Sequence, residues 1–222
     1  MLIAIIPAYN EEKNIKDVVK RSVKYVDLVV VVDDGSLDAT SREAKSAGAF
    51  VIKNKKNKGK AEAMRIGFSF ALQKGADFVV VLDADGQHNP DEIPLFMDEA
   101  KKGFDIVVGA RKFDRRLMPF RRIFANSFSS FLTSLVTHRR ILDSQSGYRL
   151  IKRNVLEKIR FTSNRYEIET EMLIKAARCG FKIGFIPIKT IYTEHAKSTV
   201  NQFIDPLRFL LLVFKLSFWR CK

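Results

Sequence analysis

The chain has 222 residues, of which 46% are hydrophobic and 29% are charged, and its formal net charge is +14. This length and composition predict one globular domain with a full hydrophobic core. No apolar run reaches the roughly 18 residues of a transmembrane helix, so none is expected. The positive charge predicts anionic partners, such as nucleotides, nucleic acid or anionic lipid headgroups.

The two cysteines, Cys179 and Cys221, lie far apart and have no partners at metal-ligand spacing. We therefore expect no disulfide framework and a reducing compartment. The first apolar run lacks a basic segment before it and breaks at Pro7, so no signal peptide is expected. The predicted location is the cytoplasm.

In the first half of the chain, short apolar runs alternate with segments of helical composition. The runs cover residues 2–6, 28–32, 50–52, 78–82 and 106–108, and helices are expected at 12–25, from Asp38 to Gly48, at 60–74 and from Pro90. This alternation predicts an α/β fold with a mostly parallel central sheet and helices on both faces.

Polar or special residues follow the predicted strands where the strands end. They are residues 7–12, 33–36, 83–85 and 109–111. The carboxyl ends of parallel strands share one edge of a sheet, where open α/β sheets bind ligands. Asp83 and Asp85, with the amide oxygen of Gln87, are oxygen ligands suited to Mg²⁺ or Mn²⁺. No P-loop and no G-x-G-x-x-G motif follows a strand, which disfavours a Rossmann dinucleotide site.

Four motifs occur in the order found in inverting family 2 glycosyltransferases, which the chain resembles. They are residues 7–11 (PAYNE), residues 32–36 (VDDGS) with Asp38 and Thr40, Gly59-Lys60, and residues 83–88 (DADGQH). Residues 143–149 (DSQSGYR), Glu167, Glu169 and Gln87 look more narrowly like dolichyl- and polyprenyl-phosphate sugar synthases. The resemblance implies the nucleotide-sugar-binding GT-A fold over almost the whole chain.

The resemblance also assigns roles to residues. It implies a nucleotide-sugar site of Pro7, Ala8, Tyr9, Glu11, Asp33, Asp34, Lys60, Asp83, Ala84, Asp85, His195 and Lys197. It implies Asp85 and Gln87 as ligands of Mg²⁺ or Mn²⁺, and Asp85, Arg111, Asp143 and Arg149 as catalytic residues, with the two arginines on phosphates. Other interpretations stay open: Glu11 is also a favourable charge at a helix start, Lys60 alone would be solvated, and a lone His195 would be structural.

The second half of the chain changes in character. We divide the chain into a nucleotide-sugar-binding half at 1–110, an acceptor-binding half at 111–202 and an amphipathic helix at 203–222. Residues 112–122 are basic, and the helix after them carries Phe124, Phe128, Phe131 and Leu135 at helical spacing. Core packing is the favoured interpretation of this stripe, and contact with lipid is the alternative.

Three further segments complete the predicted elements. A helix is expected at 166–177, and Pro187 makes 181–188 an edge strand. The last helix places Leu207, Leu210, Leu211, Phe214 and Phe218 on one face, which either meets lipid or docks on the core.

These features predict a metal-dependent enzyme that moves a sugar from a UDP- or GDP-linked donor to a polyprenyl or dolichyl phosphate with inversion. It would be peripheral at the inner face of an anionic membrane. The alternative is a relative acting on a carbohydrate hydroxyl, as in polysaccharide synthesis, with Asp143 as the base. A sugar-phosphate nucleotidyltransferase would need a glycine-rich loop after the first strand, which is missing. A nucleic-acid binder is disfavoured, because the aspartates at the sheet edge would repel its ligand.

Overall fold

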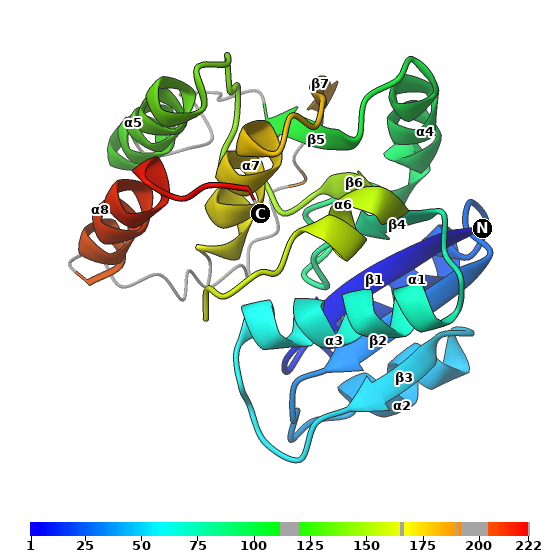
Figure 1. Cartoon of the computed structure of the whole chain (residues 1–222). Helices are drawn as coiled ribbons and strands as arrows, with labels where there is room; N and C mark the ends of the chain where they lie inside the picture. Colours follow the sequence, from blue (N-terminus) through cyan, green and yellow to red (C-terminus); the bar gives the residue numbers. More distant parts are fainter. Residues whose placement is uncertain (112–119, 165–166, 190, 192–203, 222) are drawn as a thin grey trace.

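The computed structural model describes residues 1–111, 120–164, 167–189, 191 and 204–221, and shows a central sheet flanked by helices (Figure 1). The strands are β1 (Leu2–Ala8), β2 (Leu28–Asp33), β3 (Phe50–Lys53), β4 (Phe78–Val81), β5 (Ile106–Arg111), β6 (Arg149–Lys152) and β7 (Ile183–Ile188). The helices are α1 (Ile15–Ser22), α2 (Thr40–Ser46), α3 (Lys60–Gln73), α4 (Ile93–Lys101), α5 (Phe120–Thr137), α6 (Arg153–Lys158), α7 (Ile168–Arg178) and α8 (Ile204–Ser217), with a 3₁₀ turn, η1 (Pro90–Glu92), before α4. The predicted α/β fold is therefore confirmed.

The sheet has the strand order β3-β2-β1-β4-β6-β5-β7. All neighbouring strands are parallel except β6, which runs antiparallel to both β4 and β5. Arg149, the first residue of β6, pairs with Val81 of β4 and with Val108 of β5. Because β6 runs in the opposite direction, its first residue lies at the edge where β4 ends.

The core lies on both faces of the sheet. Along β1, Ile3 and Ile5 belong to one apolar cluster and Ala4 and Ile6 to the other, which is the alternation expected of a strand covered on both sides. The first cluster includes residues of α3, α6 and α7, and the second includes residues of α1, α2 and α4. A Cβ on Gly67 of α3 would lie 2.4 Å from a methyl of Ile5, so α3 packs directly on β1.

The sequence pattern did not predict β6 or α6, and α1 begins later than expected. Residues 11–14 form a turn, in which the amides of Asn14 and Ile15 donate to the carbonyl of Glu11, before α1 begins at Ile15. The predicted edge strand is correct, because among the described residues β7 is the last strand of the sheet and pairs only with β5.

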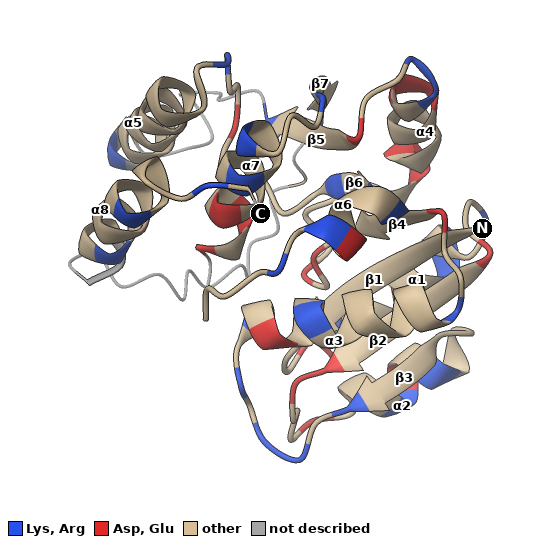
Figure 2. Ribbon diagram, viewed as in Figure 1, with Lys and Arg blue, Asp and Glu red and all other residues tan. Residues whose placement is uncertain are grey.

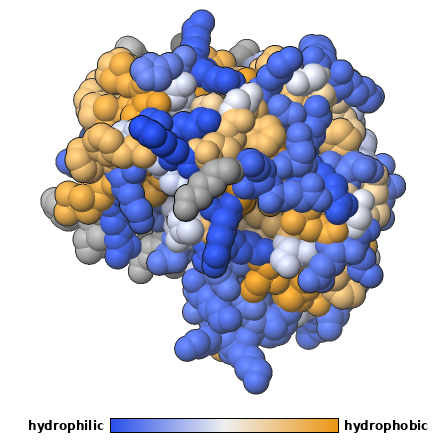
Figure 3. Space-filling model, viewed as in Figure 1, coloured by the Kyte–Doolittle hydropathy of each residue, from blue (hydrophilic) through white to orange (hydrophobic). Residues whose placement is uncertain are grey.

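The apolar stripe on α5 faces outward, so the expectation that it packs in the core is wrong. The side of α5 that faces the protein carries buried hydroxyls, those of Ser129, Ser130, Thr133 and Thr137. We call the outward apolar residues of α5 and α8 the α5–α8 face. Its exposed members are Phe120, Phe124, Phe128, Phe131, Leu135, Leu207, Leu210, Leu211, Phe214 and Phe218. Figure 3 shows apolar residues gathered over these two helices, at the left of the view.

The expectation that the chain has no disulfide framework is also wrong. Cys179, directly after α7, and Cys221, beyond α8, form a disulfide with a Cα–Cα distance of 5.2 Å. Helices α7 and α8 lie side by side here, which brings together residues 42 positions apart in the sequence. Over the ranges given above, no helix is long and apolar enough to cross a bilayer.

Candidate active site

The loops that follow β1 and β2 are tied together at the carboxyl edge of the sheet. The amide of Asn10 donates to the Ser36 hydroxyl at 2.9 Å, and the Asn10 side chain accepts from the amide of Leu37 at 3.0 Å. The amide of Glu11 donates to the Thr40 hydroxyl at 2.8 Å. Asn10 has a φ of 55°, a conformation that asparagine tolerates better than most residues. The two loops therefore form one rigid frame.

The predicted nucleotide-sugar residues within this frame differ in what they expose. Pro7, Ala8 and Ala84 are buried beneath the carboxyl edge of the sheet. Tyr9 is 44% exposed at the end of β1, where its ring can lie against a planar ligand. Burial raises the pKa of Glu11, whose carboxylate accepts from the Asn14 side chain at 3.0 Å.

Asp33 and Asp34 both turn inward and hold loops. Asp33 accepts from the amide of Ser36 at 2.8 Å, and Asp34 accepts from the amides of Lys58 at 3.0 Å and Gly59 at 2.6 Å. The loop at 54–59 lies so close that a Cβ on Gly35 would meet the Lys56 carbonyl carbon at 2.7 Å. The two carboxylates thus organise the site, and their contact with a nucleotide stays a prediction.

Lys60, the first residue of α3, is the cation at the centre of the edge. Its ammonium lies 2.6 Å from a carboxylate oxygen of Asp83 and 2.9 Å from one of Glu169, and its side chain is only 18% exposed. The interpretation of Lys60 as a solvated residue is therefore wrong. A Cβ on Gly147 would fall 2.8 Å from a carboxylate oxygen of Asp83 and 2.9 Å from the ammonium, so a larger residue here would force this pair to shift. Figure 2 shows acidic segments in the loops along this edge.

The carboxylates after β4 have opposite electrostatic surroundings. Burial acts to raise the pKa of Asp83, but the Lys60 ammonium together with other nearby positive charge, including that of Arg111, lowers the value to about 2. Burial, and then the negative charge of Asp83, raise the pKa of Asp85 to about 6. Burial lowers the pKa of His88 to about 4, so this ring is neutral at neutral pH, and its Nδ1 accepts from the Asp83 amide at 3.0 Å. Asp85 is therefore the carboxylate whose charge is least compensated.

A divalent cation fits this donor set. Asp85 is half-buried among negative charges, and its loop is held by a bond from the Gln87 amide to Asp85 Oδ1 at 3.0 Å. A cation would relieve the repulsion that raises its pKa. The described residues contain no group of three or more His, Cys, Asp or Glu side chains that could hold a metal. Mg²⁺ is commonly bound through one or two carboxylates together with substrate phosphates. Asp85 supplies one such carboxylate, and metal ligation by Asp85 and Gln87 stays a prediction.

Arg111 and Asp143 form a two-pronged ion pair beside this edge. The Arg111 side chain donates from Nε and Nη2 to the two oxygens of Asp143 at 2.7 and 2.9 Å. Asp143 is buried and also accepts from the Gln145 amide at 3.1 Å. Both of its oxygens are thus occupied, which leaves it poorly placed to take a proton from a hydroxyl.

Arg149 is fully buried, whereas a residue that contacts a phosphate of the substrate is expected to be accessible at the surface. Its guanidinium donates to the carbonyls of Ser146 at 2.7 Å, Ser144 at 2.9 Å and Glu169. It therefore holds the loop at 144–146 against the start of α7. This geometry favours a positioning role, and direct contact with a phosphate stays a prediction.

Two residues of the site were not predicted to act in it. Glu169 was noted only as part of a resemblance, although it holds Lys60 from α7. His88 lies within the motif after β4, where it stacks on Tyr148 with ring centroids 5.0 Å apart. The spacing of Glu169 within its helix gave no sign that it is buried. His195, Lys197 and residues 112–119 lie outside the described residues.

Comparison with known proteins identifies the family. The family model "Glycosyl transferase family 2" matches residues 3–160. The chain belongs to glycosyl transferase family 2. It is 36% identical to the UDP-N-acetylglucosamine–dolichyl-phosphate N-acetylglucosaminyltransferase of Methanococcus voltae, over 88% of each chain. It is 32% identical to the polyprenol monophosphomannose synthase of Mycolicibacterium smegmatis, over 84% of this chain and 76% of that one.

Solved structures show the same fold. The glucosyl-3-phosphoglycerate synthase of Mycobacterium tuberculosis, in complex with Mn²⁺, UDP-glucose and phosphoglyceric acid, superposes with a TM-score of 0.76. The match covers 98% of this chain and 79% of that one at 20% identity. This family 2 glycosyltransferase therefore has the GT-A fold, as the sequence motifs implied.

Proposed function

We propose that this glycosyltransferase moves a sugar from a nucleotide-diphosphate donor to a polyprenyl or dolichyl phosphate, with inversion and with the help of a divalent metal. The observation that carries the proposal is the half-buried carboxylate of Asp85 beside the negative charge of Asp83 at the carboxyl edge of the sheet, near the paired cations Lys60 and Arg111. The names of the two relatives favour a lipid phosphate acceptor.

Asp85 and Gln87 would hold the metal. When bound, it supplies positive charge to the diphosphate that leaves. Asp83 keeps its negative charge through Lys60 and can accept hydrogen bonds from ribose or sugar hydroxyls. Tyr9 offers its exposed ring to the base. UDP and GDP remain the two donor classes for the experiment to separate.

The pairing of Asp143 with Arg111 favours a phosphate acceptor over a hydroxyl. A phosphate is already anionic at neutral pH and attacks without a general base, whereas a hydroxyl needs one. Asp143, the candidate base, has both oxygens engaged by Arg111. Arg111 could share its guanidinium with an incoming phosphate, since arginine binds carboxylates and phosphates through the same donors.

We also propose that the protein contacts an anionic membrane through the α5–α8 face, the segment 203–222 and the basic segment 112–122. Helix α5 turns its hydroxyls inward and its aromatic side chains outward; Phe131 is 58% exposed and Thr133 fully buried. Such an arrangement suits an apolar surrounding better than water. Exposed Arg121, Arg139 and Arg208 lie on or beside the same helices and suit anionic headgroups.

The test of the activity compares acceptors and variants. The purified chain is given UDP- and GDP-sugars with Mn²⁺ and either a prenyl phosphate or a sugar alcohol. We expect transfer to the prenyl phosphate, loss of transfer in excess EDTA and in Asp85→Ala, and full transfer in the control Asp98→Ala, which alters an exposed carboxylate on α4. Efficient glycosylation of the sugar alcohol alone would instead establish the hydroxyl acceptor.

A further inference from the structure

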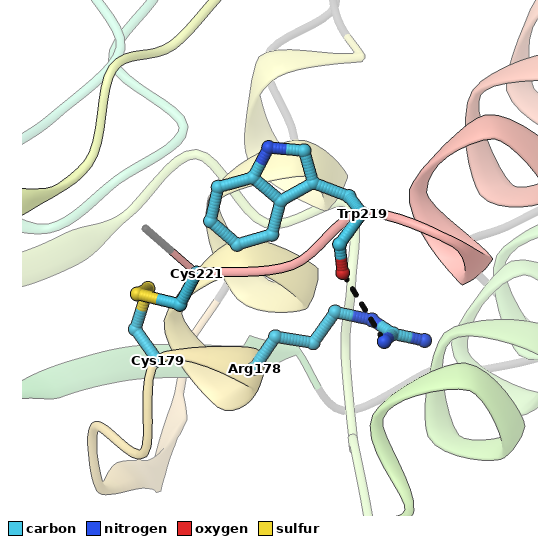
Figure 4. Close-up of a disulfide and its surroundings, with 4 residues drawn as sticks. All are labelled: Arg178, Cys179, Trp219 and Cys221. Atoms are coloured by element: carbon cyan, nitrogen blue, oxygen red, sulfur yellow. Dashed lines mark hydrogen bonds between the residues drawn. A yellow bond between two sulfur atoms is a disulfide. The ribbon is translucent and has the colours of Figure 1, made fainter.

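The junction between α7 and α8 lies beyond the residues that the family model matches, and a disulfide closes it. Figure 4 shows Cys179 at the end of α7 joined to Cys221, with Arg178 reaching from the same helix end to the backbone of Trp219. Arg178 donates to the Trp219 carbonyl at 3.2 Å and to the Ser217 carbonyl at 2.6 Å. All of these contacts hold the C-terminal end of α8.

The remaining attachment of α8 is a small apolar cluster. Its buried members are Ile174 of α7 with Val213 and Leu216 of α8, and half-buried apolar side chains pack against them, those of Val136, Phe209, Leu212 and Trp219. The ammonium of Lys175 lies 5.3 Å from the centre of the Trp219 ring and adds a cation–π contact. The large apolar residues of α8 in the α5–α8 face contribute little to this attachment, because they point outward. The disulfide adds a covalent link at the end of α8, beside the hydrogen bonds of Arg178.

We propose that Cys179–Cys221 is a redox-exchangeable site, at which a dithiol reductant releases the end of α8 from α7. Both cysteines are only half-buried, and the hollow lined by Thr137, His138 and Arg178 reaches Cys221. Exposed disulfides are the ones that exchange readily.

A thiolate of the reductant attacks one protein sulfur, the Cys179–Cys221 bond breaks, and a mixed disulfide forms. The second thiol of the reductant displaces the protein from it, so the reductant leaves as a disulfide. Two electrons pass to the protein, and two protons complete the two protein thiols.

Tryptophan emission tests the proposal directly, because Trp219 is the only tryptophan of the chain. We expect reduction by dithiothreitol under native conditions to shift the emission of the full-length protein to longer wavelength, as Trp219 leaves Lys175 and Arg178. Cys221→Ser should show the shifted emission from the start and no response to dithiothreitol. A melting curve of each form verifies that the rest of the protein stays folded.

Hydrogen exchange gives the second measurement. Amides of 204–217 should exchange at least roughly ten times faster in the reduced protein, while those of β1 and β4 do not change. Complete reduction with unaltered emission and unaltered exchange would overturn the proposal. So would two free thiols in denatured protein that has never met a reductant.

The inference rests on the proposed function only for its predicted effect on membrane binding. If α8 contributes to membrane contact, the reduced protein should bind vesicles of anionic phospholipid several-fold more weakly, at unaltered nucleotide affinity. Leu211→Asp on α8 should weaken vesicle binding with the disulfide intact, and Leu95→Asp on α4 is the matched control, since both leucines are exposed. If hydrogen exchange in α8 depends on reduction but the protein does not bind vesicles, the proposal for the disulfide stands and the membrane contact is rejected.

Discussion

Replacing Lys60 by methionine isolates the energetic role of the ion-pair cluster at the sheet edge. Methionine keeps most of the side-chain volume and removes the charge, so the change leaves Glu169 as a carboxylate that is only 3% exposed and has lost its cation. Removing one partner of a buried pair costs about 3–5 kcal/mol. Asp83, with 28% of its side chain exposed, retains some solvation and should add less. We therefore expect a loss of about 3–5 kcal/mol in the free energy of unfolding, by the same estimate.

Urea unfolding at pH 7, followed by circular dichroism, measures this loss. A second substitution, Glu169→Gln, removes the uncompensated charge, so the double variant should regain about half or more of the lost stability. Glu157→Gln, at an exposed carboxylate on α6, is the control and should regain nothing in the same background. A loss below about 1 kcal/mol in Lys60→Met, the size typical of a surface pair, would refute the assignment of a buried cluster.

Three further predictions concern the metal, the core and the disulfide. Because the pKa of Asp85 is raised to about 6, protons compete with the cation below that pH. Mn²⁺ affinity, measured by calorimetry, should therefore be constant above pH 7 and fall below pH 6. Asp85→Asn should abolish both the binding and its pH dependence. Gly67→Ala places a methyl group 2.4 Å from a methyl of Ile5 in β1. The variant protein should lose about 1–3 kcal/mol of stability, measured by thermal unfolding. An unaltered melting temperature would contradict the packing of α3 on β1. Cys179→Ser with Cys221→Ser opens a link across 42 residues and should cost about 4 kcal/mol if loop entropy dominates, which equilibrium unfolding can measure against the oxidised protein.

The sequence predicted those parts of the fold that depend on local pattern. The four buried strands β1, β2, β4 and β5 were placed within a few residues, because a strand covered on both faces gives a continuous apolar run. The edge strand β3 was also located, although its residues are half-buried or exposed. β6 escaped notice because it has four residues and follows a polar loop that resembled a site motif. Its antiparallel direction depends on pairing with β4 and β5, which are distant in the sequence.

Periodicity identified the stripe on α5 but could not tell which side of the helix is buried. The opposite side carries Ser129, Ser130, Thr133 and Thr137, and small hydroxyl residues can face either water or a packed interior once their hydrogen bonds are made. In the structure Thr133 donates to the Ser129 carbonyl and Thr137 to the Thr133 carbonyl, both at 2.8 Å. The bonds that make burial possible are within the helix itself, so composition alone does not reveal them.

The site residues were predictable as a set and less so in their roles. The motifs located the edge where Asp83, Asp85, Lys60 and Arg111 meet. They gave no sign that Lys60 is shared between Asp83 and Glu169, because Glu169 lies 109 positions further along the chain. Long-range pairs of this kind, like the disulfide, depend on the tertiary arrangement and not on any local spacing.

The inside-out arrangement of α5 separates two properties that most helices combine. Its link to the rest of the protein is made by hydroxyls, such as Ser129 to Ser144 at 2.8 Å and the Ser144 amide to Ser130 at 3.0 Å. The aromatic side chains on its outer side do not take part in these hydrogen bonds. Substitutions among Phe124, Phe128 and Phe131 can therefore alter what the outer surface prefers to touch while the loop that carries Asp143 stays in register. The outer side of this helix can vary through evolution, or be redesigned, without repacking the domain.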